Sequence, residues 1–433
     1  MQENMKDSTP YDVIVIGGGS AGMMAAGVAA EHGAKVLLLE KNRKLGKKLS
    51  ITGGGRCNIF NAQEDMHCLL QNYGDAQKSL YGVFARFGMQ ETQAYFETLG
   101  LPIMVEERNR AFPVSEKAQD VVDVLRKQLI KNCVEIRTNC TVQSINVHSG
   151  SIRHVVVNGQ ELLARRYILA TGGTSRPETG STGDGFTWLA KSGHVLRTPT
   201  PNVTPLETKE LWVREISGVT AQCVRAIFYC NKKRAFSFDG NILFTHFGLS
   251  GFTIINNAYK VAEILKQGNV TVEIDCFPDF NHKQMDQQVM DVLRQHGSKR
   301  LKNTLKFLTP PGMVGAFTFL LEERMDLDVQ NSVLSKVDRQ TMVHLFKGIP
   351  LTIKGLMGFE KAVVADGGLS LKELDMRTMR SKRVHNLYVV GDLLDINRPS
   401  GGFSLQLCWS TGYIAGLDSS RQEELGDSSL GSI

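Results

Sequence analysis

The clearest hydrophobic pattern of the chain lies over residues 11–40. An apolar run, YDVIVI, leads into glycines 17–19 and is followed by a stretch rich in Ala and Met up to residue 31. A second apolar run, VLLL, ends just before Glu40. Short β-branched runs bounded by glycine predict strands, and an apolar stretch of helical length between them predicts a buried helix. The pattern therefore predicts a strand–helix–strand unit whose strands lie parallel.

The pattern after this unit alternates helical and strand-like segments. Helical periodicity covers residues 79–99 and 118–132, and β-rich segments cover 134–147 and 152–168. Residues 165–173, RRYILATGG, predict a strand that runs into a glycine turn. This N-terminal part is therefore predicted to be an α/β domain.

The pattern changes near residue 196 and returns near residue 355. Strand-like segments such as CVRAIFYC and NVTVEIDCF come first, and polar helical stretches follow them. The strand-like NLYVVGD and a final helical segment then resemble the N-terminal part again. We therefore predict an α/β domain over 1–195 and 355–433, interrupted by a domain at 196–354 that is β-rich over 196–280 and helical over 281–347.

Composition adds little to this picture but excludes several classes of protein. The net charge of +6 is mild for 433 residues, so anionic partners are allowed without being required. No apolar run reaches the length of a membrane span, and the polar N-terminus lacks a signal sequence, so we expect a cytoplasmic protein. The eight cysteines include no C-x-x-C pair, so neither a metal site nor a disulfide framework is predicted.

The turn after the first strand carries the first chemical signal. Gly17, Gly19 and Gly22 form a G-x-G-x-x-G motif between a strand and a helix, which is the context that a dinucleotide-binding turn requires. The first glycine permits the tight turn, the second lets a diphosphate approach the backbone, and the third lets helix and strand pack closely. The helix N-terminus attracts the phosphates, and Glu40 is placed to accept hydrogen bonds from ribose hydroxyls.

Two further strand ends favour FAD as the dinucleotide. The strands of ILATGG and LYVVGD each end in a small turn, and Asp392 closes the second. Such ATG and GD elements recur in flavoproteins with two dinucleotide-binding folds, in which the acid reaches the ribityl chain. The chain has one G-x-G-x-x-G motif and no cysteine pair beside it, so a disulfide reductase is not expected. NADH or NADPH remains a candidate electron donor, without a Rossmann unit of its own.

Longer blocks resemble one family. GKKLSITGGGRCNIFN, GSTGDGF, ILFTHFGLSG, VADGGLSLKELDMRTMRSK and LYVVGDLLDINRPSGGFSLQLCWSTG resemble the BaiN-like (HI0933-like) flavoproteins over nearly the whole chain. Two departures are Asp392, where many members have Glu, and Phe252, where many have Pro. The resemblance implies an FAD-binding Rossmann-like domain, an insert that is partly β-barrel-like and partly helical, and an active site between the flavin and the insert.

The predicted FAD contacts gather in the turns and glycine clusters. The three glycines of TGGGRCN are expected to lie along the cofactor, with a mobile surface loop as the alternative. The backbone of PSGGFS, followed by a helix starting near Ser404, is expected at the pyrimidine end of the flavin, with a helix-capping turn as the alternative. The full predicted set is Gly17, Gly19, Ser20, Ala21, Gly22, Glu40, Lys41, Lys48, Thr52, Gly53, Gly54, Gly55, Cys57, Asn58, Val142, Ala170, Thr171, Gly172, Gly391, Asp392, Gly401, Gly402, Phe403 and Ser404.

Three residues are candidates for catalysis. His246 lies in a glycine-rich segment and has a side chain suited to proton transfer near neutral pH, although a histidine bonded within a turn is the alternative. Cys57 is a candidate proton donor or nucleophile, with simple packing as the alternative. Arg56 is a candidate anion-binding group, with a structural ion pair as the alternative. Asp395 and Arg398 rank below these three.

The predicted function is that of an FAD-dependent oxidoreductase. The leading reaction is hydride transfer from reduced flavin to a conjugated C=C bond of a steroid-like or enone-like small molecule, as the family resemblance implies. The alternatives are a ribosomal RNA uridine reductase, an amine oxidase and a redox-gated flavin-binding protein without turnover. Basic clusters at 232–234, 294–306 and 377–383 matter only if the partner is RNA. No membrane partner is expected.

Overall fold

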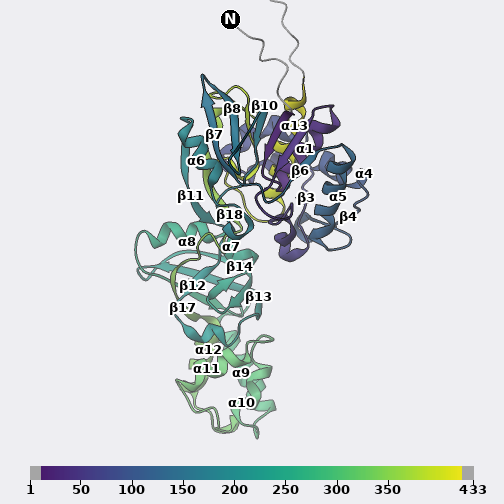
Figure 1. The fold of residues 1–433 in the computed structure, drawn as a ribbon. Coiled ribbons are helices and arrows are strands. Elements are labelled where there is room, and N and C mark those ends of the chain that lie inside the picture. Colours follow the sequence, from purple (N-terminus) through teal and green to yellow (C-terminus); the bar gives the residue numbers. More distant parts are fainter. Residues whose placement is uncertain (1–10, 422–433) are drawn as a thin grey trace, which may run out of the picture. The chain divides into compact units, whose positions relative to one another are not determined.

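The computed structural model describes residues 11–421, which divide into two units. Unit 1 holds the residues up to Thr200 and from Val364 onward, and unit 2 is Pro201–Val363 (Figure 1). The sequence pattern predicted boundaries at 196 and 354, and the structure divides the chain several residues after each. Within the described residues, no helix combines the length and the apolar character needed to cross a membrane.

Unit 1 is built on a seven-stranded sheet in its described part, in the order β19-β20-β21-β10-β1-β2-β6. The five strands from β21 to β6 are parallel. Strands β1 and β2 are almost wholly buried because parallel sheets are covered on both faces, which explains their unbroken apolar sequence. The strands are β1 Tyr11–Ile16, β2 Val36–Leu39, β6 Glu135–Arg137, β10 Ala164–Leu169, β19 Leu374–Asp375, β20 Arg380–Ser381 and β21 Leu387–Val389.

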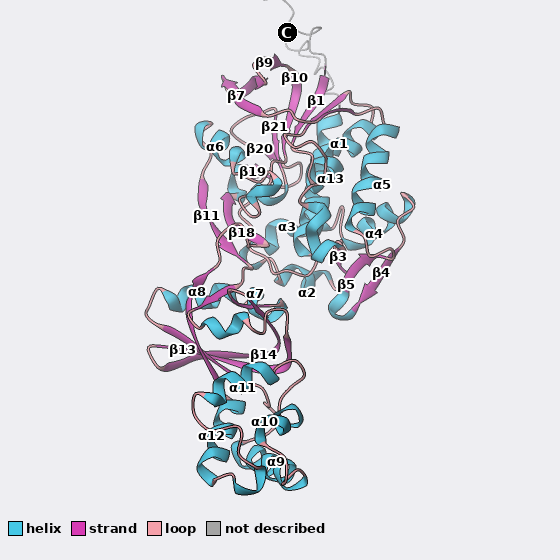
Figure 2. Cartoon of the chain, turned by 60° about the horizontal axis from the view of Figure 1, so that its bottom comes forward, coloured by secondary structure: helices cyan, strands magenta, loops and turns pink. Residues whose placement is uncertain are grey.

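Helix α1 (Ser20–Glu31) joins β1 to β2, as the strand–helix–strand pattern predicted. It packs against the C-terminal helix α13 (Phe403–Ser420), and the two lie side by side in Figure 2. Their backbones approach closely, since a Cβ added to Gly412 would lie 2.5 Å from the carbonyl oxygen of Ala21. Two helices that are far apart in the sequence therefore share one core.

The remaining elements of unit 1 surround this sheet. The sheets β3-β5-β4 and β7-β8-β9 are both antiparallel. The helical periodicity predicted over 79–99 corresponds to two helices, and Gly88 caps the second and donates its N–H to Glu91. The elements are α2 Met66–Gln71, α3 Gln77–Phe84, α4 Met89–Thr98, α5 Ala118–Lys131, α6 Asp184–Lys191, β3 Phe60–Asn61, β4 Ile103–Glu106, β5 Arg110–Pro113, β7 Val142–His148, β8 Ser151–Val157 and β9 Gln160–Leu162.

The chain passes between the units through two paired strands, β11 (Leu196–Asn202) and β18 (Val364–Leu369). Gly367 has φ +94°, and a Cβ there would lie 2.6 Å from the carbonyl oxygen of Thr198. Only glycine therefore fits this crossing.

Unit 2 contains a closed β-barrel in the order β12-β15-β14-β13-β16-β17 and a group of helices. The stretch 313–347, predicted as helical, contains two separate helices whose residues Phe317 and Phe346 pack with ring centres 4.9 Å apart. A Rossmann-like domain interrupted by a barrel and helices confirms the predicted fold class. The elements are β12 Leu206–Thr208, β13 Thr220–Cys230, β14 Lys233–Thr245, β15 Gly248–Ser250, β16 Val270–Asp275, β17 Ile349–Leu356, α7 Phe252–Asn256, α8 Ala258–Leu265, α9 His282–Gln295, α10 Leu301–Thr304, α11 Val314–Glu322 and α12 Lys336–Lys347.

Candidate functional site

Four parallel strands of unit 1, β1, β2, β10 and β21, end at the same edge of the sheet. The turns that follow them touch one another. The N–H of Gly18 donates to Glu40 at 2.8 Å, and a Cβ on Gly173 would lie 3.0 Å from the carbonyl oxygen of Asp392. Segments far apart in the sequence therefore meet where open α/β sheets bind their ligands.

The glycine turn after β1 has the geometry that its motif predicts. Gly17 has φ +107°, and a Cβ there would lie 2.4 Å from the carbonyl oxygen of Ala170. A Cβ on Gly22 would lie 1.8 Å from the carbonyl oxygen of Gly17, so this position requires glycine for packing. A Cβ on Gly19 would meet no atom within 4 Å, which leaves the N-terminal end of α1 open to a ligand.

Glu40 is buried, with 7% of its surface exposed, and its carboxylate holds two turns together. Oε2 accepts from the Gly18 N–H at 2.8 Å, and Oε1 accepts from the backbone and side-chain nitrogens of Asn42, both at 2.7 Å. Oε1 already accepts two donors and Oε2 accepts one, so Oε2 has room for one further donor and the predicted ribose contact stays compatible with this clamp.

The segment TGGGRCN forms a tight, irregular turn at the end of the 3₁₀ segment η1 (Leu49–Gly55). Gly53, Gly54 and Gly55 have φ values of +56°, +69° and +90°. All three are exposed, and a Cβ on Gly54 or Gly55 would meet no atom within 4 Å. At Gly54 and Gly55 the backbone conformation alone therefore favours glycine, whereas a Cβ on Gly53 would also lie 3.0 Å from the backbone nitrogen of Asn58. The predicted contact of these glycines with FAD stays a prediction.

Cys57 lies in the core of unit 1 rather than at its surface. Its side chain is fully buried, and burial raises the pKa of the thiol to about 12. A nucleophilic cysteine needs a thiolate, which this environment disfavours. The structure therefore opposes the predicted role as a nucleophile and favours the packing alternative.

Arg56 forms a structural ion pair. Its guanidinium pairs with Glu106 and Glu116 and lies 4.2 Å from the ring centre of Phe112. Hydrogen bonding to Arg56 lowers the pKa of Glu106. The alternative interpretation of Arg56 as a structural group thus agrees with the geometry, and this arginine is not a free anion-binding group.

The segment from TGGGRCN to Asn61 lies against the second glycine cluster, PSGGFS. Asn61 donates from its side chain to the carbonyl oxygen of Gly401 at 3.1 Å. With the Asn58 amide oriented by its hydrogen-bond partners, its oxygen accepts from the Gly402 N–H at 3.1 Å. A Cβ on Gly402 would lie 2.2 Å from the backbone of Phe60, and α13 begins at the next residue. The start of α13 is thereby fixed beside the TGGGRCN turn.

A buried charge network follows the end of β21. The guanidinium of Arg398 is almost fully buried, pairs with Oδ1 of Asp392 and donates to Oγ of Ser404 at 2.8 Å. Lys48 lies with Nζ 3.8 Å from Oδ2 of Asp392 and 3.3 Å from Oγ of Ser175. Burial lowers the pKa of Lys48, while Asp392 acts in the opposite direction. Arg398, ranked low from the sequence, joins Asp392 to the start of α13. Its position six residues after the GD turn was the available signal.

The donor and acceptor set of this edge fits a dinucleotide with a diphosphate and several hydroxyls. Among the described residues, the buried hydroxyl oxygens of Thr171 and Thr174 have no hydrogen-bond partner within the chain. Buried polar groups of this kind are rare without a ligand or water to satisfy them. The half-buried cation of Lys48, the open helix end at Gly19 and the carboxylate of Asp392 complete a set that suits such a ligand.

The other predicted contacts occupy varied positions. Lys41 donates to Thr182 at 2.6 Å and pairs with Asp184 at 2.7 Å. Val142 is a buried residue at the start of β7. The carbonyl of Phe403 accepts from the Tyr73 hydroxyl at 2.8 Å. Residues at or next to the strand ends, helix starts and glycine turns are Ser20, Ala21, Thr52, Ala170, Gly172 and Gly391.

His246 belongs to unit 2, in the turn between β14 and β15. Its ring is exposed and packs edge-on against Phe247, with ring centres 4.9 Å apart. Among the described residues, neither ring nitrogen has a hydrogen-bond partner, so the alternative of a histidine bonded within the turn does not hold.

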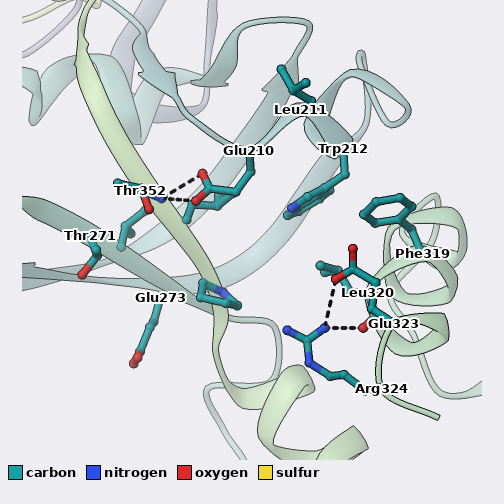
Figure 3. A pocket seen from close by; sticks show the side chains of 13 residues that line it. Glu210, Leu211, Trp212, Thr271, Glu273, Phe319, Leu320, Glu323, Arg324 and Thr352 are labelled. Atoms are coloured by element: carbon teal, nitrogen blue, oxygen red, sulfur yellow. Dashed lines mark hydrogen bonds and ion pairs between the residues drawn. The ribbon is translucent and has the colours of Figure 1, made fainter.

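Unit 2 also contains a cavity of about 480 Å³ between its barrel and α11 (Figure 3). Trp212, Phe319 and the carboxylates of Glu210 and Glu323 line it. Glu210 binds the backbone N–H of Thr352 with both carboxylate oxygens at 2.9 Å, so its role is to hold β17 in place. No glycine of the described chain lines this cavity, in contrast to the site in unit 1 where β1, β2, β10 and β21 end.

Comparisons with known proteins agree with this fold. The model of the family described as HI0933-like protein Rossmann domain matches residues 11–418. A 3-dehydro-bile acid delta(4,6)-reductase of Clostridium scindens is 29% identical over 405 residues, covering 93% of this chain and 97% of that protein. A ribosomal RNA dihydrouridine synthase of Haemophilus influenzae is 28% identical over 417 residues, covering 94% of this chain and 98% of that protein.

A solved structure with the same fold is a 3-ketosteroid delta1-dehydrogenase from Sterolibacterium denitrificans. It has a TM-score of 0.54 at 14% sequence identity and covers 95% of this chain and 99% of that chain. At this level of identity the likeness is one of fold.

Proposed function

The chain belongs to the HI0933-like family, and we propose that it is an FAD-dependent oxidoreductase that adds a hydride to a C=C bond conjugated with a carbonyl group. The observation that carries the proposal is the meeting of four strand ends around a glycine turn, Glu40 and Asp392. The cation of Lys48, which lies 3.8 Å from Asp392, adds to it because a cation at this edge suits a diphosphate.

Two relatives support this reaction class by the activities in their names. One is named as a bile-acid delta(4,6)-reductase and the other as a dihydrouridine synthase. Forming dihydrouridine adds hydrogen across a ring C=C bond that is conjugated with a carbonyl. Both names therefore describe the reduction of the same kind of bond, in very different substrates.

The residues of unit 1 bind and orient the cofactor in this proposal. The N-terminus of α1 and the cation of Lys48 neutralise the diphosphate of FAD. The carboxylates of Glu40 and Asp392 accept hydrogen bonds from hydroxyls of the ribose and the ribityl chain, respectively. Gly402 starts α13, whose N-terminal dipole favours negative charge at the pyrimidine end of the flavin. Bound and reduced FAD supplies the hydride.

A proton must reach the carbon next to the one that receives the hydride, because hydride addition leaves an enolate. We assign this proton to His246, which is exposed and carries no partner on its ring nitrogens among the described residues. A histidine exchanges protons readily near neutral pH. Cys57 is unsuited because its thiol is enclosed in the core.

The test uses the full-length chain purified with FAD under anaerobic conditions. The flavin is reduced with NADH, NADPH or dithionite, and a 3-keto-4-ene steroid or a uridine-containing RNA is then added. We expect one of these acceptors to restore the oxidised flavin spectrum. A chain that binds no FAD would contradict the proposal. Reoxidation by oxygen alone, with peroxide formed from an amine, would identify an oxidase instead, and a flavin that no donor reduces would identify a protein without turnover.

The role of His246 is tested by His246→Gln. We expect flavin reoxidation by the acceptor to slow by about 10²-fold or more, which is the range for loss of a general acid. FAD binding should not change. The matched control is His148→Gln, which alters an exposed histidine of unit 1. Equal rates in the two variants would remove His246 from the mechanism.

A further inference from the structure

The helical part of unit 2 carries a segment of unbalanced charge. No Asp or Glu occurs between Asp291 and Glu322. The cations of this stretch are concentrated in its first half and are Arg294, Lys299, Arg300, Lys302 and Lys306. The electrostatic potential of this region therefore depends on which of these cations are neutralised from elsewhere in the fold.

Two of the lysines keep an uncompensated charge. Arg300 and Lys302 share the carboxylate of Asp328, at 2.9 and 2.6 Å, and Arg294 lies 3.7 Å from Asp291. Among residues 11–421, neither Lys299 nor Lys306 has a carboxylate within ion-pair distance, and both are exposed.

Both of these lysines surround an exposed aromatic ring. Phe307 is 49% exposed, and the ammonium groups of Lys299 and Lys306 lie 5.4 and 5.1 Å from its ring centre. His296 stacks on the same ring, with centres 4.6 Å apart and planes 22° apart. The four side chains form one platform of stacked rings and cations, hereafter the Phe307 platform.

The platform is not required by the core of unit 2. Leu301, Leu305 and Leu308 of the same segment are buried and supply its contacts with the core. Phe307 lies between them in sequence and faces solvent instead. An ordinary solvated helix face would present the lysines without a large apolar ring among them.

We propose that the Phe307 platform docks a single-stranded nucleic acid. Unpaired bases stack on aromatic rings, and lysines contact the phosphates on either side. An acidic peptide would use the cations but not the stacked rings, and a neutral apolar ligand would use the rings but not the cations. The inference goes beyond the proposed reaction, because it concerns a surface of unit 2 and holds whichever compound accepts the hydride.

The experiment measures binding of the FAD-loaded full chain to fluorescein-labelled oligouridylate of 12 nucleotides by anisotropy, over a series of salt concentrations. A double variant, Lys299→Glu with Lys306→Glu, should weaken binding more than tenfold. It should also reduce the slope of log affinity against log salt by about 1.4, which is about 0.7 for each lost phosphate contact. Phe307→Leu should weaken binding about tenfold and leave the salt slope unchanged, because it removes stacking without charge.

The matched control is a second double variant, Lys283→Glu with Lys336→Glu, which makes the same change of charge at two exposed lysines in the first turns of α9 and α12. An equal loss of binding in this variant would overturn the proposal by showing attraction to net charge alone. Tight binding of duplex RNA to wild type would overturn it too, since paired bases cannot stack on the ring. An oligothymidylate of equal length shows whether the ligand is RNA or DNA, and preferential binding of either single strand supports the proposal.

A second measurement needs no substitution. Bound oligouridylate should protect Lys299 and Lys306 from acetylation by an N-hydroxysuccinimide ester, while Lys283 reacts as before. Labelling that is the same with and without the oligonucleotide would contradict the proposal. The reoxidation of reduced flavin by a steroid enone, measured on the same preparations, separates a failed docking surface from a failed reaction.

Discussion

Glu40→Gln replaces a buried carboxylate by an amide of the same shape. The carboxylate accepts three hydrogen bonds, one from Gly18 and two from Asn42. An amide has one oxygen, which we expect to face the two donors of Asn42. Its NH₂ group then faces the N–H of Gly18, so two hydrogen-bond donors are buried against each other and neither has an acceptor. Leaving a buried donor unsatisfied costs about 1–3 kcal/mol, and the two remaining bonds lose their charge assistance. The expected loss in free energy of unfolding is about 2–4 kcal/mol.

The assay is urea unfolding of the FAD-free protein, followed by the fluorescence of its tryptophans. Trp188 and Trp409 report on unit 1, and Trp212 reports on unit 2. Replacing Trp212 by Phe in the background isolates the signal of unit 1, because two units can unfold in separate transitions. The matched control is Glu31→Gln at an exposed position near the end of α1. A Glu40→Gln variant within about 0.5 kcal/mol of the background protein would refute the clamp, since that is the usual range for surface substitutions.

Three further predictions follow from unit 1. Burial lowers the pKa of Lys48 in the folded protein below its unfolded value of about 10.4. Between these two pKa values the unfolded state binds more protons than the folded state, so the free energy of unfolding rises with pH in that range. Lys48→Met should abolish that rise and stabilise the FAD-free protein by about 1 kcal/mol at pH 7. It should also weaken FAD binding, and calorimetry can measure both effects. Gly412→Ala should destabilise unit 1 by about 1–3 kcal/mol in the same urea assay, because its Cβ would lie 2.5 Å from a carbonyl oxygen of α1. The control is Gly82→Ala in α3 of the same unit, whose Cβ would meet no atom within 4 Å and which should stabilise by about 0.5–1 kcal/mol. Iodoacetamide at pH 8 should modify the exposed Cys68 in the native protein and Cys57 only after denaturation. The reason is that the Cys57 thiol is buried and has a pKa of about 12. Mass spectrometry of the peptides shows which cysteine is modified in each state.

The fold could be predicted where one local pattern determines one element. The run YDVIVI, the glycine turn and VLLL correspond to β1, the start of α1 and β2, because apolar runs of this length are buried on both faces of a parallel sheet. The helical periodicity over 79–99 was confirmed but did not reveal the break between two helices, since α3 ends at Phe84 and Gly88 caps α4. Periodicity averages over such a break, whereas the hydrogen bond from Gly88 to Glu91 depends on a single residue.

The candidate site could be predicted only as far as its residues lie in motifs. The turns with Gly17, Glu40 and Asp392 were predicted to act together, and the structure brings their strand ends to one edge of the sheet. The pairing of Arg398 with Asp392 could not be inferred, because a pairing depends on side-chain direction rather than on spacing. The burial of Cys57 was equally hidden, since its position beside three exposed glycines suggested the opposite.

Several local energetic costs meet at the edge of the sheet where β1, β2, β10 and β21 end. Lys48 keeps a cation in a place that lowers its pKa, and two threonine hydroxyls lack partners within the described chain. Arg398 buries a second cation beside a single carboxylate, that of Asp392, so the network has more positive than negative charge. An anionic ligand would relieve the excess of positive charge, because phosphates compensate the cations. A ligand that binds only the folded state stabilises it by about 2.7 kcal/mol at one hundred times its dissociation constant. The costs are therefore tolerable in a protein that folds with its cofactor present.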